Sequence, residues 1–171
     1  MESQVKNQSG KILIAYYSKT GNTRAAAEYI HQSVGGDLFE IKPARDYPRE
    51  YRATTEIARQ EKGANARPEL AANVNNMAQY DTIFLGYPNW WSTMPMFFFT
   101  FLESHDLKGK TIIPFCTNGG GGLGQSVADI KSLCPGSKIL DALAIRSGNE
   151  KKSENAISVW LRDIFDLLSK N

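Results

Sequence analysis

The sequence predicts an α/β protein built on a parallel sheet with helices on both faces. Short apolar runs alternate with segments of helical periodicity along the 171 residues, and this alternation is typical of parallel sheets. The runs Ile83–Leu85 and Thr111–Cys116 are apolar without a period of two, as in strands that are covered on both faces. A chain of this length forms one domain and buries about 70% of the surface exposed in its unfolded state.

Five strands are predicted in order along the chain, at Lys11–Tyr17, Asp37–Lys42, Thr82–Tyr87, Thr111–Thr117 and Lys138–Arg146. Pro114 lies inside the fourth strand and has no N–H group for the sheet, so we expect a local irregularity there. The first ten residues are polar and are expected to form a flexible tail. Residues 11–171 are then the single domain.

Apolar residues at helical spacing predict the helices between these strands. Ala27, Ile30 and Val34 share one face of the first helix, which Gly35–Gly36 ends. The same spacing precedes a Pro-Gly stop at Val127, Ile130 and Cys134. Ser153 is the expected N-cap of the last helix. That helix carries the longest apolar stripe, formed by Ile157, Trp160, Leu161, Ile164 and Leu168.

Two segments depart from this alternation. Residues 43–80 are too long for a simple crossover and contain one charged helix, at about residues 49–60. A connection of this kind covers a site or, more commonly, carries a solvated surface helix. Met94–Leu102 predicts a helix that is apolar nearly all round, with Pro95 at its first position. Either the long connection or a second copy of the chain would bury it, so the sequence leaves open whether the protein is a monomer or a homodimer.

The composition excludes several classes of protein. The formal net charge is +2, with Lys and Arg scattered among acidic residues, so no nucleic-acid or membrane partner is expected. No signal peptide and no run of about 18 apolar residues is present, which favours a cytoplasmic location. Cys116 is expected near the end of a strand and Cys134 at the far end of the following helix. That helix rises about 15 Å, so the two thiols are too far apart for a disulfide. No metal site is predicted.

The segment Ser18–Thr23 falls between the first strand and the N-terminus of the first helix. Free N–H groups and the positive end of the helix dipole attract an anion there, and Gly21 allows close approach of the backbone. Neither G-x-x-x-x-G-K-[ST] nor G-x-G-x-x-G is present, so the pattern suits a terminal monophosphate rather than a Mg-nucleotide or a pyrophosphate. The alternative is that these residues only cap the helix and shape the turn.

Two more loops reach the same edge of the sheet, because they follow the third and fourth parallel strands. Gly86–Pro95 contains Trp90 and Trp91 between two prolines, and such rings stack on a flat aromatic ligand. We expect one of the two to pack on the apolar helix behind it. Thr117–Gly124 is rich in glycine. Its backbone either reads the polar edge of a heterocycle or is simply flexible.

A loop suited to phosphate, an aromatic wall and a loop whose backbone can contact the polar edge of a heterocycle together describe a site for flavin mononucleotide (FMN). Tyr17–Thr23, Gly86–Trp91 and Phe115–Gly120 resemble the flavodoxin family, specifically a bacterial reductase-type branch, and the resemblance extends from about Lys11 to the final helix. It implies a flavodoxin-like three-layer α/β/α sandwich with sheet order 2-1-3-4-5 and FMN as cofactor. The FMN contacts that it implies are Ser18, Thr20, Gly21, Asn22, Thr23, Tyr87, Pro88, Asn89, Trp90, Trp91, Thr93, Thr117, Asn118, Gly119, Gly120 and Gly124.

The resemblance leaves the choice between catalyst and electron carrier open. The family's carriers are strongly acidic and place a tyrosine of the third loop over the flavin, whereas this chain is slightly basic and has glycines there. The first hypothesis is therefore an oxidoreductase that takes electrons from NAD(P)H to a quinone or similar acceptor, with no catalytic acid–base residue. The second is a carrier between protein partners, favoured by the lack of a basic residue in the glycine loop. An FMN-binding module without turnover is the third, and His31 and His105 are expected to be structural.

Overall fold

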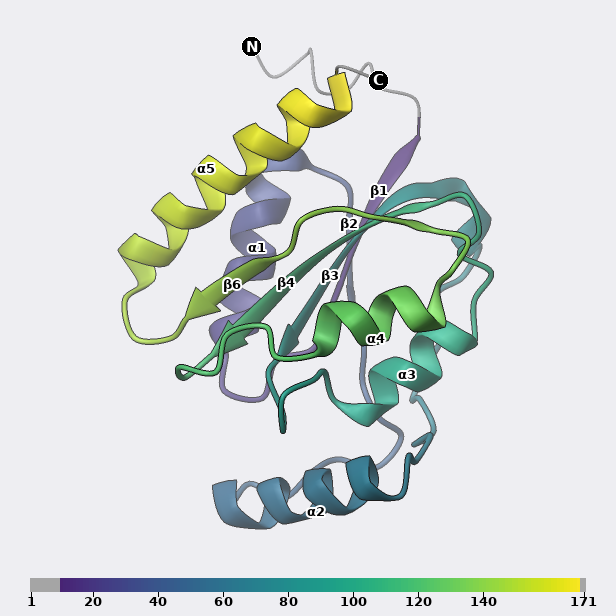
Figure 1. Cartoon of the computed structure of the whole chain (residues 1–171), viewed down its shortest axis with the longest axis vertical. Coiled ribbons are helices and arrows are strands. Elements are labelled where there is room, and N and C mark those ends of the chain that lie inside the picture. Colours follow the sequence, from purple (N-terminus) through teal and green to yellow (C-terminus); the bar gives the residue numbers. More distant parts are fainter. Residues whose placement is uncertain (1–9, 170–171) are drawn as a thin grey trace.

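The computed structural model describes residues 10–169, so the expected tail lies outside the described residues except for Gly10. All strand pairs in its single sheet are parallel. The sheet order is β2-β1-β3-β4-β5, with β6 also paired to β4. This order confirms the predicted fold (Figure 1). The strands are β1 (Lys11–Tyr16), β2 (Asp37–Glu40), β3 (Tyr80–Pro88), β4 (Thr111–Asn118), β5 (Lys138–Ile139) and β6 (Leu143–Arg146).

The fifth predicted strand is divided into β5 and β6. β5 pairs with the first two residues of β4, and β6 pairs with its last four. Pro114 falls between these two pairings, while on the other side of β4 it stays in register with Leu85. Because proline has no N–H group to donate, the irregularity expected at Pro114 appears in the neighbouring strand, and β4 itself is continuous.

Helices cover both faces of the sheet and bury two separate cores (Figure 1). One core includes Phe84, Ile113 and the buried stripe of the last helix, and the other includes Leu85, Ile112 and the aromatic helix. The first face is covered by α1 (Asn22–Val34) and α5 (Glu150–Ser169), and the second by α3 (Met96–Glu103) and α4 (Ser126–Leu133). No helix within residues 10–169 is long and apolar enough to cross a bilayer.

The last helix begins earlier than the sequence predicts. Asn149 precedes its first turn, and its side-chain Oδ1 accepts a hydrogen bond from the Lys152 N–H at 3.0 Å. The Ser153 hydroxyl lies inside the helix and donates to the Asn149 carbonyl at 2.9 Å. Asn149 therefore acts as the N-cap, and the prediction of Ser153 was wrong because the amide one turn earlier already satisfies a free N–H group.

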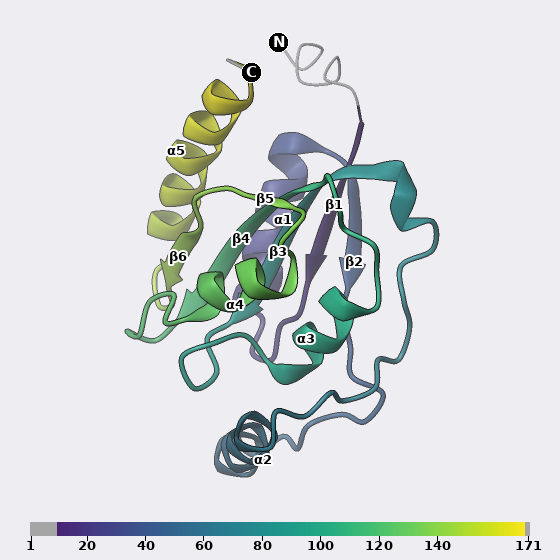
Figure 2. The same ribbon diagram turned by 45° about the vertical axis from the view of Figure 1, so that its right-hand side comes forward.

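The long connection does cover part of the protein. Its helix α2 (Tyr51–Gly63) lies beyond the carboxyl edge of the sheet (Figure 2). After α2 the chain, with the short helix η2 (Met77–Gln79) before β3, returns past α3. There the Arg67 guanidinium lies 5.2 Å from the centre of the Phe99 ring and pairs with Glu103 at 2.8 Å. Contacts within this one chain bury most of the apolar side chains of α3, namely Met96, Phe97, Phe98, Phe101 and Leu102.

Candidate functional site

The order of the strands reverses between β1 and β3, and ligands of such sheets bind beyond the carboxyl ends at this reversal. The loops after β1, β3 and β4 meet there, and α2 lies over them (Figure 2). They enclose a cavity of about 380 Å³, within the range of small-molecule sites. The cavity is lined by Lys19, Thr20, Thr23, Arg49, Tyr51, Thr54, Thr55, Ala58, Pro88, Asn89, Trp90, Trp91 and Thr117.

The first loop is shaped to present backbone donors. Gly21 adopts a φ of 99°, in the left-handed region, and its N–H donates to the Ser18 hydroxyl at 3.0 Å. The Ala25 N–H is bonded to the Gly21 carbonyl at 3.0 Å. Within the described chain, the three N–H groups between them, of residues 22–24, have no hydrogen-bond partner. These donors and the helix dipole form an anion site at the start of α1.

The threonine hydroxyls of this region have different tasks. Thr23 is buried, and its hydroxyl lies 2.7 Å from the hydroxyl of Thr117. This bond ties the loop after β1 to the end of β4. Thr20 is exposed and lines the cavity, and its Oγ1 accepts a hydrogen bond from the Asn22 side chain at 3.2 Å. Of the loop hydroxyls that line the cavity, Thr20 is therefore the one that is free to turn toward a ligand.

The two tryptophans also divide their roles. Trp90 packs edge-on against Tyr17 and Tyr47, with ring centres 5.7 Å and 5.0 Å away. Trp90 is therefore held by two tyrosines that themselves pack on Phe97 of α3, and the expected direct packing of a tryptophan on that helix stays a prediction. Trp91 is 43% exposed and is held from α2, since its indole N–H donates to the Thr55 carbonyl at 2.9 Å. One tryptophan thus anchors the loop, and the other joins it to the long connection.

The second and third loops are locked together. The Asn89 amide donates to the Gly122 carbonyl at 2.8 Å, and the Gln125 N–H donates to the Ser92 carbonyl at 2.7 Å. Gly124 has a φ of 54°, and a Cβ on it would clash with Ser92. A side chain at Gly124 is therefore excluded both by backbone conformation and by space.

Seven of the predicted contacts line the cavity: Thr20, Thr23, Pro88, Asn89, Trp90, Trp91 and Thr117. Ser18, Gly21 and Asn22 shape the first loop beside it. The cavity is not lined by the glycines expected to contact the polar edge of the ligand, which are Gly119, Gly120 and Gly124. His31 and His105 are not among the residues that line it.

Three further predicted contacts use their side chains inside the protein. The fully buried Tyr87 donates its phenol O–H to Ser126 at 2.8 Å. The Thr93 hydroxyl donates to Asp129 at 2.5 Å. The Asn118 amide donates to the Ile145 carbonyl at 3.2 Å, and its oxygen accepts the Gly120 N–H at 2.9 Å. These side chains support the loops, and the predicted contacts of the three residues with a cofactor stay predictions.

The residues that sequence reasoning missed are Lys19 and five residues of the long connection, Arg49, Tyr51, Thr54, Thr55 and Ala58. We call residues 45–63 the cover. Its place is fixed in part by the Pro48 carbonyl, which accepts hydrogen bonds from the Lys19 ammonium at 2.8 Å and the Thr54 hydroxyl at 2.6 Å. The length of the connection signalled a cover, but the sequence carried no sign of which residues face the cavity.

The electrostatics of the cavity favour an anion. Lys19 and Arg49 are the charged residues among those that line it, and both are cations. Behind the tryptophan loop, burial raises the pKa of Tyr17 and of Tyr47, so both phenols stay neutral at physiological pH. Within residues 10–169 there is no group of three or more His, Cys, Asp and Glu side chains that could hold a metal.

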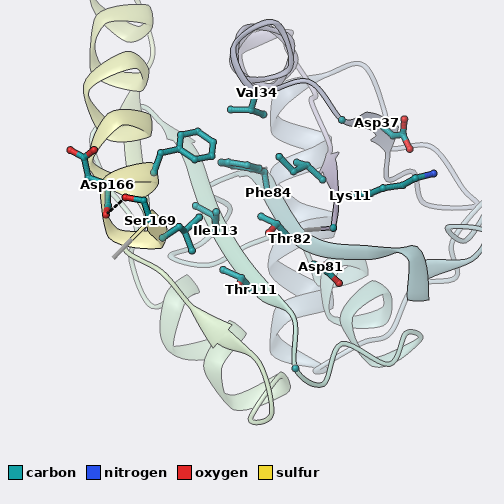
Figure 3. Close-up of a pocket in the computed structure, with 16 residues that line it drawn as sticks. Lys11, Val34, Asp37, Asp81, Thr82, Phe84, Thr111, Ile113, Asp166 and Ser169 are labelled. Atoms are coloured by element: carbon teal, nitrogen blue, oxygen red, sulfur yellow. Dashed lines mark hydrogen bonds between the residues drawn. The ribbon is translucent and has the colours of Figure 1, made fainter. Parts of the chain in front are cut away.

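A larger hollow, of about 760 Å³, lies at the opposite edge of the sheet (Figure 3). It is formed around the amino ends of β1, β3 and β4 and the last turns of α5. Its charged lining residues are Lys11 and three aspartates, Asp37, Asp81 and Asp166. This excess of carboxylates disfavours an anionic ligand, and no strand ends there in a ligand-binding loop. The cavity under α2 at the carboxyl edge is therefore the candidate site.

Comparison with known proteins agrees with this geometry. A family model described as Flavodoxin matches residues 11–164. The chain belongs to the flavodoxin family. None of the curated proteins compared matches it significantly. Three solved structures of flavoproteins are similar to the chain over most of its length.

A candidate flavoprotein from Bacteroides eggerthii DSM 20697 is 36% identical, with a TM-score of 0.76, over 90% of this flavodoxin-family chain and 97% of that one. A second, from Bacteroides uniformis ATCC 8492, is 30% identical, with a TM-score of 0.75, over 87% and 98%. A flavoprotein in complex with FMN from Lactobacillus acidophilus NCFM is 23% identical, with a TM-score of 0.71, over 89% and 99%. This last likeness supports the fold.

Proposed function

We propose that this protein binds FMN in the cavity under the cover and uses it to move electrons from NAD(P)H to a quinone or similar small acceptor. The observation that carries the proposal is that the two ends of the cavity differ in their chemistry. One end is suited to an anion, because the Thr20 hydroxyl and the cations Lys19 and Arg49 line the cavity beside the unpaired N–H groups at the start of α1, and Trp90 and Trp91 form its aromatic end. The FMN-bound structure from Lactobacillus acidophilus, which has the same fold, supports the choice of ligand.

The residues present fit FMN. Its phosphate requires donors and positive charge, which the start of α1, Lys19 and Arg49 supply. Its ring system requires an apolar wall, which the tryptophans supply. When bound, FMN supplies the redox chemistry, and the protein supplies position and electrostatics.

The chain's own contribution is to hold the cofactor and exclude water. The described residues that line the cavity include no His, Asp, Glu or Cys, so no side chain there is placed to act as an acid or base near neutral pH. Trp90 is held rigidly by Tyr17 and Tyr47. This rigidity fixes one wall of the cavity in advance, which lowers the cost of orienting a ligand.

The glycine loop favours a catalyst over a carrier. A Cβ built at Gly119, Gly120 or Gly122 would meet no atom within 4 Å, so this loop leaves open space. A small planar substrate can approach through such space, and the net charge of +2 gives no acidic field to steer a basic protein partner. A cytoplasmic location with both thiols reduced remains a prediction.

A flavodoxin-type electron carrier is the second candidate. The cover closes over a cavity of about 380 Å³, which limits the space for a second planar molecule. Electrons would then be exchanged with protein partners at the exposed rim of the site, where Trp91 lies. This observation keeps the carrier as an alternative to the oxidoreductase.

The test is anaerobic mixing of the FMN-loaded protein with NADPH and then with NADH, followed by flavin absorbance. Rapid bleaching identifies a nicotinamide-dependent reductase, and quinones and nitroaromatics are then compared as acceptors. Slow or no bleaching, with full reduction by dithionite, identifies a carrier. A protein that takes up no FMN contradicts both proposals.

A further inference from the structure

Arg49 is a cation without a protein partner at the candidate site. It lines the cavity from the cover. Its guanidinium forms no hydrogen bond or ion pair with any other described residue, whereas Arg24, Arg59 and Arg67 each pair with a glutamate. Arg45, Arg52 and Arg146 also have no such partner among the described residues, but Arg49 differs from them because it lines the cavity. A guanidinium that faces a cavity and is left unpaired by the protein is available to an anionic ligand.

The cover brings Arg49 to the phosphate loop. Lys19 lies within that loop, and its ammonium donates to the carbonyl of Pro48, the residue before Arg49, at 2.8 Å. The same carbonyl accepts the Thr54 hydroxyl at 2.6 Å, which fixes this point of the cover. Arg49 and the loop residues Thr20 and Thr23 therefore line one cavity from two sides.

The charge of the cavity selects the kind of group that Arg49 meets. Lys19 and Arg49 are cationic, and no carboxylate is among the residues that line the cavity. The planar guanidinium matches a phosphate with two parallel hydrogen bonds, which a lysine cannot provide. The Lys19 ammonium uses one of its N–H donors in the hydrogen bond to the Pro48 carbonyl, whereas all N–H donors of the Arg49 guanidinium are free.

We propose that Arg49 binds the phosphate of FMN, so that the phosphate site is completed by the cover and not by the loop after β1 alone. This inference rests on the proposed function, because it takes FMN as the ligand. It assigns to the long connection a direct part in choosing the cofactor. The protein then distinguishes FMN from riboflavin, which has the same ring and side chain but no phosphate.

The test compares the affinities of the apo-protein for FMN and for riboflavin by quenching of flavin fluorescence. The variants are Arg49→Ala, Arg49→Gln and, as a matched control, Arg52→Ala, an exposed arginine in the first turn of α2 that does not line the cavity. Loss of a charge-assisted hydrogen bond predicts that Kd for FMN rises about 10-fold or more in both Arg49 variants. Kd for riboflavin stays unchanged, and the control matches the unmodified protein.

Three results would overturn the inference. Unchanged FMN affinity in both Arg49 variants would show that the loop holds the phosphate by itself. Equal losses for FMN and riboflavin would show a general disturbance of the cavity. Unchanged FMN affinity with a raised KM for NADPH would assign Arg49 to the electron donor instead. An unmodified protein that binds neither flavin contradicts the proposed function itself, which separates the two failures.

Discussion

At the scale of single residues, the hydroxyls around the first loop are not equivalent. Thr23 and Thr117 bond to each other at 2.7 Å in a buried contact, whereas Thr20 is exposed beside the cavity. Removing the Thr23 hydroxyl would leave that of Thr117 unpaired and so would mix a loss of stability with a loss of binding. Thr20 is the residue at which binding can be tested separately.

Thr20→Ala is expected to weaken FMN binding about 10-fold without changing the melting temperature of the apo-protein, because an exposed hydroxyl to a charged phosphate is lost. Titration of flavin fluorescence measures the affinity. Thr20→Ser, which keeps the hydroxyl, serves as control and is expected to bind FMN like the unmodified protein. Equal affinities of the alanine and serine variants would remove Thr20 from the phosphate site.

Both cysteines are expected to be unreactive in the native protein. Burial raises the pKa of Cys116 to about 12 and that of Cys134 to about 11, and the thiolate is the reactive form. A thiol reagent at pH 8 should therefore titrate two thiols in guanidinium chloride and almost none without it. A thiol that reacts within seconds in the native protein would contradict this prediction.

The same two groups set a direction for stability at high pH. The native state keeps their protons above about pH 9, the ordinary pKa, where the unfolded chain releases them. Their contribution to the free energy of unfolding is complete below pH 9 and falls as the pH rises toward 11 and 12. Urea denaturation of Cys116→Ala beside the unmodified protein, from pH 8 to 10, should show a weaker decline in the variant.

Which side chains reach the site could be predicted only in part. The spacing of glycines, threonines and tryptophans located all three loops. It did not reveal that Tyr87 points into the core, because alternation along a strand says that neighbours point apart but not which of them faces a ligand. Nor did it find Arg49 and Tyr51, since their contact with the cavity depends on a fold contact between residues 19 and 48.

At the scale of elements, the apolar segments were predicted well because the pattern of apolar residues within each segment indicates which of its faces is buried. The period of the apolar residues gave the four helices that cover the sheet, α1, α3, α4 and α5, and the uninterrupted apolar runs gave β1, β3 and β4. The charged helix α2 was predicted as a helix, but its position was not. Only Thr54 and Ala58 of its residues are buried, so no apolar stripe indicates what it packs against.

Sparse burial of α2 predicts that it opens more easily than the sheet. Its links to the rest of the site include the Trp91 indole on the Thr55 carbonyl and the Lys62 ammonium on the Trp91 carbonyl. Amide hydrogen exchange of the apo-protein should be faster in residues 51–63 than in β3 and β4. Addition of FMN should slow exchange in α2 because the ligand contacts the cover.

The control for this exchange experiment is riboflavin at equal saturation. It is expected to protect α2 less than FMN does, because it lacks the group that Arg49 would bind. Exchange in α2 as slow as in β4 without any flavin would contradict the description of α2 as a loosely held cover.

At the scale of the whole molecule, the sheet separates two cores that have no buried residue in common. Ile112 lies in the core under α3 and α4, and Ile157 lies in the core under α1 and α5. Both side chains are buried. Ile112→Val and Ile157→Val are each expected to lower the free energy of unfolding by about 1 kcal/mol.

The double variant is expected to lose the sum of the two single losses within about 0.5 kcal/mol, because the sites are independent. Urea unfolding followed by both tryptophan fluorescence and far-ultraviolet circular dichroism measures these values, and coincident transitions would support a single cooperative domain. Separate transitions would divide the chain into two units, contrary to the predicted domain organisation. A large coupling energy between the two substitutions would mean that a packing change in one core is transmitted through the sheet to the other core.

The open space beside Gly119 has a consequence for the evolution of such proteins. Gly120, Gly122 and Gly124 have positive φ angles and strongly prefer glycine, whereas Gly119 has no such angle and no neighbour within 4 Å of a built Cβ. The glycine run can therefore accept a large side chain at its first position at little structural cost. Gly119 lies outside the lining of the cavity, so a side chain there would act from the rim. If an aromatic ring at Gly119 reaches across the cavity mouth and closes it, the reductase and the carrier are one substitution apart on the same scaffold.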